Sequence, residues 1–136
     1  MMDMLLTPIG VVRSPLSARE DAPKQGYEGA PSAWIELSPD LSAGLDGLVV
    51  GQEIIVISWL HQARRDLLAV HPRNNLQAPL TGVFATRSPD RPNPLGLHRV
   101  QILAIVGTSL RVGPLEAVDG TPIVDIKPTL GTVADS

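Results

Sequence analysis

The chain has 136 residues, 43% of them apolar and 18% charged, with a formal net charge of −3. This composition excludes a disordered chain, and the length is sufficient for one domain with a buried core. The sequence contains no cysteine, which excludes disulfides, thiol catalysis and zinc held by cysteine. It shows no signal-peptide pattern and no apolar run of membrane-spanning length, so we expect a cytoplasmic protein that does not contact membranes.

The first half of the chain predicts three strands and one short helical turn. The first strand covers residues 7–13 and is followed by a long loop over 16–31, which is rich in proline and glycine. Alternating apolar and polar residues predict a strand over 33–37, and 41–48 predicts one helical turn. Residues 52–60 form a β-branched apolar run, which predicts a strand that is buried on both faces.

The second half of the chain also predicts mostly strands. Residues 61–70 predict a short helix, 72–80 a loop and 82–86 a strand. Three further strands follow, the first two joined as a hairpin through Gly107 and Thr108: 97–106, 109–112 and 121–127. Helical periodicity is poor throughout, and the chain holds 13 prolines. We therefore predict a single mainly-β domain over 1–136, folded as a closed or partly closed β-barrel.

Residues 82–96, GVFATRSPDRPNPLG, combine a short apolar run with three prolines and two arginines. Because proline fixes φ, we expect this segment to hold Arg87 and Arg91 on a stiff, extended support. The same prolines also suit a tight corner that closes the barrel. The wider stretch 61–99 contains six arginines and two acidic residues, which is compatible with phosphate or RNA contact and equally with a solvated basic loop.

The common nucleotide-binding and catalytic motifs do not occur in the sequence. The glycines around residue 47 lack the G-x-G-x-x-G spacing and precede a predicted strand, so a Rossmann nucleotide site is not supported. The three histidines have no metal-ligand spacing, and no serine lies in a G-x-S-x-G elbow. We therefore expect no metal site and no hydrolase of that kind. Polar residues instead collect at the ends of predicted strands, as a small-molecule site requires.

Three motifs carry a resemblance to a known family: IGVVRSP at 9–15, GVFATRSPDRPNPLGLHRV at 82–100 and VDGTPIVDIKP at 118–128. They closely resemble the TsaA-like family, also called the TrmO or YaeB family. The resemblance implies a non-Rossmann barrel that uses S-adenosylmethionine (SAM) to methylate N6 of threonylcarbamoyladenosine beside the tRNA anticodon. It also implies a homodimer with the cofactor site near the subunit interface. Compared with longer bacterial members, we expect a short form without their C-terminal domain. The alternative is a SAM-binding protein of the same fold that methylates a small metabolite or only senses the cofactor.

The resemblance also implies a set of cofactor-binding residues. A carboxylate of Glu116 or Asp119 would accept from ribose hydroxyls or the methionine ammonium. Arg87 or Lys24 would bind the methionine carboxylate, because charge-assisted hydrogen bonds suit it. Leu97 would flank the adenine. The full set is Pro23, Lys24, Gln25, His61, Gln62, Arg87, Leu97, Glu116, Ala117, Val118 and Asp119.

Methyl transfer from a sulfonium depends mainly on in-line approach of the acceptor, with a proton acceptor as an aid. Asp119, Asp125 and His61 are the candidates for that proton acceptor, and the sequence does not single out one of them. Candidates for contact with tRNA phosphates are Arg91, Arg64 and Arg65. This chain departs from the family pattern at His98, where the family carries a small hydroxyl residue, and at Lys24, where it carries arginine.

Overall fold

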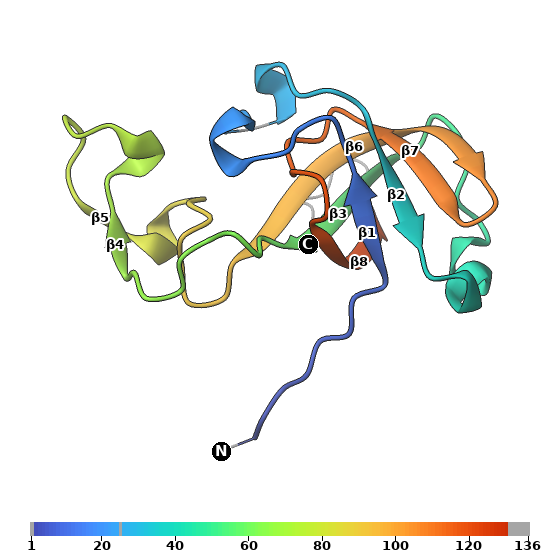
Figure 1. The fold of residues 1–136 in the computed structure, drawn as a ribbon, viewed down its shortest axis with the longest axis horizontal. Helices are drawn as coiled ribbons and strands as arrows, with labels where there is room; N and C mark the ends of the chain where they lie inside the picture. The colour runs from blue at the N-terminus through green and yellow to red at the C-terminus, as the bar shows by residue number, and fades with distance from the viewer. Residues whose placement is uncertain (1, 25, 131–136) are drawn as a thin grey trace.

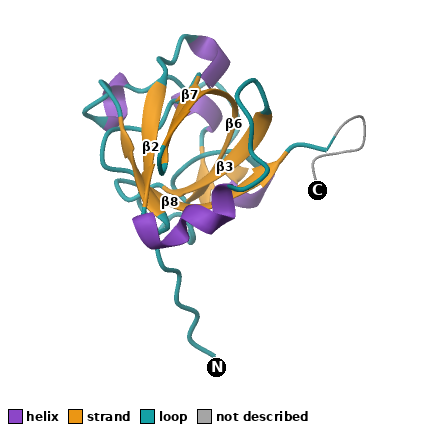
Figure 2. Cartoon of the chain, turned by 90° about the vertical axis from the view of Figure 1, so that its right-hand side faces the viewer, coloured by secondary structure: helices purple, strands orange, loops and turns teal. Residues whose placement is uncertain are grey.

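Six antiparallel strands close into a barrel. Figures 1 and 2 show this barrel from two directions. The computed structural model describes residues 2–24 and 26–130. The strands follow one another around the barrel in the order β1-β2-β7-β6-β3-β8, and β8 pairs with β1 to close it. The prediction of a mainly-β barrel is therefore confirmed. The barrel strands are β1 (Gly10–Arg13), β2 (Ala33–Leu37), β3 (Glu53–Trp59), β6 (Leu95–Val106), β7 (Ser109–Gly113) and β8 (Pro122–Pro128).

Alternation of side chains along the strands builds the core of the barrel. In β6 the residues at even positions from Gly96 to Ile102 point inward, and their neighbours in sequence are exposed. In β3, Ile54, Val56 and Ser58 are buried, whereas Ile55, Ile57 and Trp59 on the outer face are only half-buried. The prediction that this strand is buried on both faces is therefore wrong. An antiparallel barrel strand packs one face on the core, and its other face lies on the outside of the barrel wall.

The connections between strands divide between the two ends of the barrel. Residues 14–32, 60–94 and 114–121 all leave from one end, which we call the long-loop end. The opposite end carries the β6–β7 hairpin and the linker between β2 and β3, and we call it the hairpin end. That linker contains the 3-10 helix η3 (Pro39–Leu45), and Leu45 and Leu48 of the linker pack against the core. The predicted helical turn over 41–48 thus exists, although it begins and ends earlier.

The connection 60–94, which we call the arm, projects from the barrel and lies at the left in Figure 1. It holds a short ladder of β4 (Ala69–Val70) with β5 (Thr81–Gly82) and two 3-10 turns, η4 (Pro72–Asn74) and η5 (Val83–Ala85). Among the described residues, no helix is long and apolar enough to cross a membrane. Two further 3-10 turns, η1 (Arg19–Asp21) and η2 (Gly26–Glu28), lie in the predicted loop between β1 and β2.

Two predictions for the arm are wrong. Residues 61–70 form turns and β4 instead of a helix, and 83–85 form η5 instead of a strand. The backbone groups of Arg64 explain the first difference, because its N–H donates to the Asp90 carboxylate and its carbonyl accepts from the N–H of Arg91. Groups engaged by a distant segment are not available for the i to i−4 bonds of a helix.

Candidate functional site

At the long-loop end, hydrogen bonds of Asp119 join the β1–β2 loop to the connection between β7 and β8. The N–H of Ser14 donates to Oδ1 of Asp119 at 3.0 Å, and the N–H of Asp119 donates to the carbonyl of Leu16 at 2.6 Å. Asp119 is exposed, yet one of its carboxylate oxygens is engaged by this backbone contact. The side chain thereby ties the end of β1 to the segment that carries Glu116.

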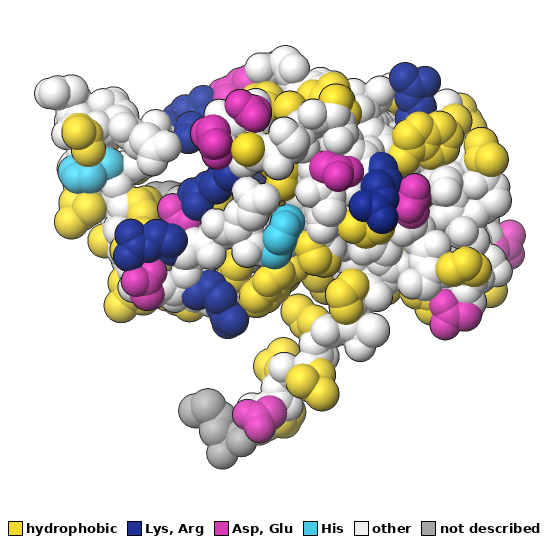
Figure 3. Space-filling model, in the orientation of Figure 1, with side chains coloured by type: hydrophobic (Ala, Val, Ile, Leu, Met, Phe, Trp, Pro, Cys, Tyr) yellow, Lys and Arg dark blue, Asp and Glu magenta, His cyan; other side chains and the backbone are white. Residues whose placement is uncertain are grey.

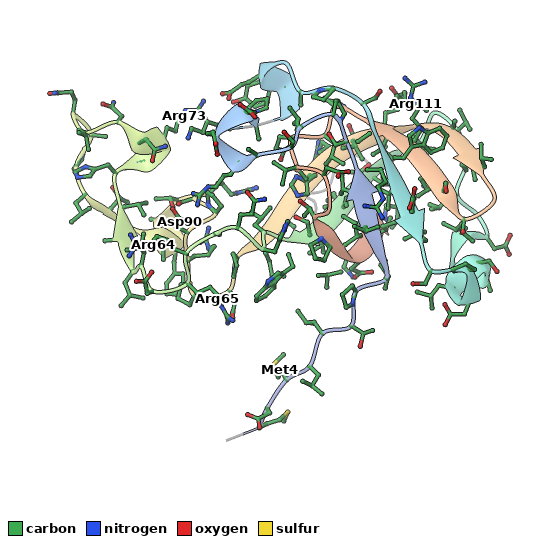
Figure 4. All side chains as sticks on the ribbon, viewed as in Figure 1. Met4, Arg64, Arg65, Arg73, Asp90 and Arg111 are labelled. Carbon is green, nitrogen blue, oxygen red and sulfur yellow. The ribbon has the colours of Figure 1, made fainter. Side chains whose placement is uncertain are left out.

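Asp90 joins the same loop to the arm. Both terminal nitrogens of Arg19 donate to the Asp90 carboxylate at 2.8 Å, and the N–H of Arg64 donates to it at 2.9 Å. The hydrogen bonds from Arg19 hold the pKa of Asp90 below its usual value, although partial burial opposes the shift. The same contact raises the pKa of Arg19. A second ion pair, between Arg73 and Glu28, joins the loop to η4. Figure 4 shows Asp90 and Arg73 at two separate places along the arm.

The three arginines predicted to face RNA all have partners within the arm or at its base. The Arg91 guanidinium donates to the carbonyls of Val83, Thr86 and Ser88 at 2.7–3.0 Å. These contacts fix the shape of the first part of residues 82–96, which we call the proline segment. Arg64 pairs with Asp66 at 2.9 Å. The guanidinium of Arg65 lies 5.0 Å from the ring centroid of Trp59, in cation–π geometry, and also donates to Pro92 and Asn93. Contact of these residues with RNA stays a prediction.

Arg87 differs from its neighbours in the arm. Its side chain is exposed, and it makes no hydrogen bond or ion pair with any residue that the structure describes. Lys24, in the β1–β2 loop, is also exposed and without such a partner among the described residues. These two cations are therefore available to an anionic group. Gln25, the next predicted cofactor residue, lies outside the described residues.

A chain of three polar side chains runs from the barrel interior to the long-loop end. Nε2 of His98 lies 2.6 Å from Oγ of Ser58, and its Nδ1 lies 2.6 Å from Oε1 of Glu116. His98 is 3% exposed and Ser58 is fully buried, whereas the Glu116 side chain is 15% exposed. The sequence marked His98 only as a departure from the family pattern, and it placed neither Ser58 nor His98 in the site.

The remaining predicted residues are distributed over different surfaces. His61 and Gln62 are exposed in the turn where the arm leaves β3. Pro23 is half-buried in the β1–β2 loop, whereas Ala117 and Val118 are buried, so their side chains belong to the packed interior. Leu97 is exposed on the outer wall of the barrel, on the opposite side of β6 from His98.

Asp125 does not join the cluster around Glu116. It lies 3.2 Å from Nζ of Lys127 and lines a cavity of about 650 Å³ that η3 borders at the hairpin end. Leu37, Leu41, Leu45 and Asp46 line the same cavity. None of the predicted cofactor residues among those described lines it. Among the described parts of the chain, no three His, Asp or Glu side chains converge as metal ligands would.

Comparison with known proteins agrees with the fold and the motifs. A family model described as the tRNA-methyltransferase O N-terminal domain matches residues 11–135. A probable S-adenosyl-L-methionine-binding protein of Methanothermobacter thermautotrophicus is 45% identical over 127 residues, which cover 93% of this chain and 90% of the relative. An S-adenosyl-L-methionine-binding protein of Archaeoglobus fulgidus is 43% identical over 124 residues, or 91% of this chain and 88% of that protein.

A crystal structure of TrmO from Pseudomonas aeruginosa superimposes with a TM-score of 0.77 at 30% identity. The match covers 99% of this chain and 61% of that chain, so the present chain spans less than two thirds of its length. The barrel is thus the TrmO fold. Since the family model covers most of the sequence and relatives above 40% identity span nearly all of it, the chain belongs to the family of the tRNA-methyltransferase O N-terminal domain.

Proposed function

We propose that this protein is a SAM-dependent methyltransferase that acts on tRNA, with N6 of threonylcarbamoyladenosine beside the anticodon as the methyl acceptor. Family membership and the names of the SAM-binding relatives support this proposal. The observation that carries it is the contrast between Arg87 and the other arginines of the arm. Arg64, Arg65 and Arg91 are engaged, whereas Arg87 stays exposed and free of partners among the described residues.

The residues at the long-loop end suit the chemical groups of SAM. The free guanidinium of Arg87 suits the methionine carboxylate, because the planar fork binds carboxylates through two hydrogen bonds. Glu116 suits the ammonium or the ribose hydroxyls, since only one of its oxygens is bonded to a described residue. Leu97 and Leu95 on the outer wall offer exposed apolar surface for the adenine ring.

The chemistry asks for orientation more than for acid–base groups. When bound, SAM supplies the methyl carbon: the acceptor nitrogen forms its N–C bond as the C–S bond breaks, and the sulfide leaves neutral. The proton that the nitrogen loses passes to a nearby base or to solvent. The part of the protein is to hold the acceptor in line and to exclude competing water, which can supply much of the acceleration. Asp119, with one carboxylate oxygen outside its contact to Ser14, is better placed at this end than Asp125.

The proposed working form is a homodimer in which a second copy completes the cofactor site. Leu97 faces outward from the barrel wall, whereas Glu116 hydrogen-bonds to an inward residue, so one subunit does not bring the two together around one ligand. The arm also exposes apolar side chains at Leu68, Leu76, Leu80 and Phe84, the last of them 81% exposed. Figure 3 shows hydrophobic side chains on the surface of the arm, at the left of the view. A surface of this kind is typical of an interface between subunits.

The alternative function, a SAM-binding protein that methylates a small metabolite or only senses SAM, also has an observation in its favour. The engaged arginines of the arm leave less free positive charge for phosphates than the sequence suggests. Salt dependence of tRNA binding separates the two functions, because phosphate contacts weaken steeply as salt rises.

The test begins with calorimetric titration of SAM into the wild type and two variants, Arg87→Ala and Lys127→Ala. We expect micromolar binding by the wild type, roughly tenfold weaker binding after loss of the Arg87 charge-assisted contact, and no change for Lys127→Ala. Transfer of labelled methyl from SAM to tRNA with threonylcarbamoyladenosine, and not to tRNA without it, then identifies the acceptor. Failure of the wild type to bind SAM would overturn the proposal. If the protein binds SAM but neither methylates tRNA nor binds it in a salt-dependent way, that result would select the alternative.

A further inference from the structure

From the buried chain Ser58–His98–Glu116 we infer that His98 is a positioning residue, which orients the Glu116 carboxylate so that Oε2 faces the bound SAM. This inference rests on the proposed function, since it concerns the same site. It assigns a task to the imidazole that replaces the small hydroxyl of the family pattern.

The geometry leaves one arrangement of protons when Glu116 is ionised and the ring of His98 is neutral. A carboxylate is an acceptor only, so the 2.6 Å contact to Oε1 requires a proton on Nδ1 of His98. In the neutral ring Nε2 is then an acceptor, and the hydroxyl of Ser58 donates to it at 2.6 Å. Every polar atom of the buried pair is satisfied in this arrangement, in agreement with the absence of unpartnered buried side-chain atoms among the described residues.

Gly96 and the strand register hold the imidazole in place. Ser58 of β3 lies opposite Gly96 of β6, and His98 lies opposite Val56. A Cβ at position 96 would lie 2.6 Å from Oγ of Ser58 and 2.8 Å from Nε2 of His98. Glycine therefore lets the serine and the ring pass close beneath the β6 backbone, and hydrogen bonds at both ring nitrogens fix the orientation of the ring.

A rigid imidazole determines which oxygen of Glu116 meets a ligand. Oε1 is bound to His98, whereas Oε2 makes no hydrogen bond to a described residue and is not buried. A carboxylate that is already oriented loses little side-chain freedom when the ligand arrives, and preorganisation of this kind strengthens binding. The free lone pairs of Oε2 then suit an ammonium or a pair of hydroxyls.

The chain has the connectivity of a hydrolase triad, but its burial excludes that function. A nucleophilic serine must reach a carbonyl carbon of the substrate, and Ser58 is fully buried beneath Gly96. The exposed member is Glu116, at the other end of the chain. The ligand therefore meets the carboxylate, and the imidazole acts through it.

Two nearly isosteric variants separate positioning from packing. The amide nitrogen of asparagine lies about where Nδ1 of histidine lies, so His98→Asn keeps a donor to Glu116. The amide of glutamine instead reaches the position of Nε2, so His98→Gln keeps the contact with Ser58 and loses the donor. We expect SAM affinity within about threefold of the wild type for His98→Asn and roughly tenfold weaker for His98→Gln, since the lost bond involves a charged acceptor. Val100→Ala, a truncation on the buried face of the same strand that removes no member of the hydrogen-bonded chain, is the control for packing and should keep a SAM affinity close to that of the wild type.

Thermal unfolding of the same variants shows whether a difference in affinity reflects stability. Equal SAM affinities for His98→Asn and His98→Gln would overturn the inference. A loss of SAM affinity that only parallels the loss of thermal stability across the variants would also overturn it. If either variant does not fold, nitrogen-15 spectra of the histidine rings in the wild type decide. We expect a proton on Nδ1 of His98 whose resonance moves on addition of SAM, and an unchanged resonance at saturation would overturn the inference. A wild type that fails to bind SAM overturns the proposed function itself, whereas one that binds while His98→Gln is unaffected overturns only the positioning role.

Discussion

The guanidinium of Arg19 and the carboxylate of Asp90 meet fork to fork, each terminal nitrogen 2.8 Å from a different carboxylate oxygen. The two residues are 71 positions apart in the chain, one in η1 and one in the proline segment of the arm. Asp90 also accepts the N–H of Arg64, so a single carboxylate joins the β1–β2 loop to two parts of the arm. The loop carries Lys24 and the arm carries Arg87, and this contact sets where the two cations lie relative to each other.

We expect Asp90→Asn to lower the free energy of unfolding by about 1 kcal/mol, because the pair is partly exposed and screened by solvent. The amide keeps one acceptor but turns its NH₂ group toward the guanidinium of Arg19. Urea unfolding measures the loss, and hydrogen exchange should show faster exchange in residues 16–24 and 86–92. Asp66→Asn, which breaks only the exposed pair with Arg64, is the control and should leave both measurements unchanged. Equal effects of the two substitutions would contradict the joining role of Asp90.

The stabilising effect of Asp90 should disappear in acid. Its pKa in the folded protein is lowered, chiefly by the hydrogen bonds from Arg19, so the folded state favours the ionised carboxylate. A lowered folded pKa contributes stability above the unfolded value, about 4 for aspartate, and that stability is lost as the pH falls through the folded pKa. Unfolding of the wild type and Asp90→Asn should therefore differ at pH 7, and the two should converge below about pH 4. A difference that grows in acid would have the wrong sign.

We expect Gly96→Ala to destabilise the barrel by about 1–3 kcal/mol, as overpacked cores do. The new Cβ would lie within 2.8 Å of both Ser58 Oγ and His98 Nε2, and both of these side chains are buried and hydrogen-bonded to each other. Thermal unfolding measures the loss, and SAM titration should show weaker binding because His98 shifts away from Glu116. Gly44→Ala is the control, because a Cβ there meets no atom within 4 Å. Similar stabilities for the two variants would show that the contact at Gly96 is relieved at little cost.

Arg87→Ala and Arg91→Ala should affect different measurements, although the two residues lie only four positions apart. Removal of Arg91 leaves the carbonyls of Thr86 and Ser88 without a donor among the described residues, and leaves that of Val83 with donors from Thr86 alone. Hydrogen exchange in residues 83–94 should therefore rise. Removal of Arg87 should leave exchange and thermal unfolding unchanged, because its side chain has no partner among the described residues. The effect of Arg87→Ala should appear only in SAM binding. Faster exchange in the Arg87 variant would mean that this arginine also supports the arm.

Local patterns predicted most of the barrel. The strand at 33–37 has the bounds that its alternation predicts, and the hairpin through Gly107 and Thr108 lies where the turn residues place it. The arm was not predictable in the same way. The expected helix at 61–70 gives way to turns because Asp90 and Arg91 engage the backbone of Arg64. No local pattern could show that contact, since its partners lie 26 and 27 positions away.

The sequence by itself determined the strand alternation, the turns, the poor helical periodicity and the three motifs of the family, because each depends on residues that are neighbours in the chain. Only the tertiary structure decided which polar side chains are free and which are engaged. Among the arginines of the arm it left Arg87 open and used Arg91 to hold three carbonyls. It also brought Ser58, His98 and Glu116 into one hydrogen-bonded chain across β3, β6 and the connection to β8. Whether a polar side chain is free, and in which direction it points, depends on partners that only the closure of the barrel brings within hydrogen-bond distance.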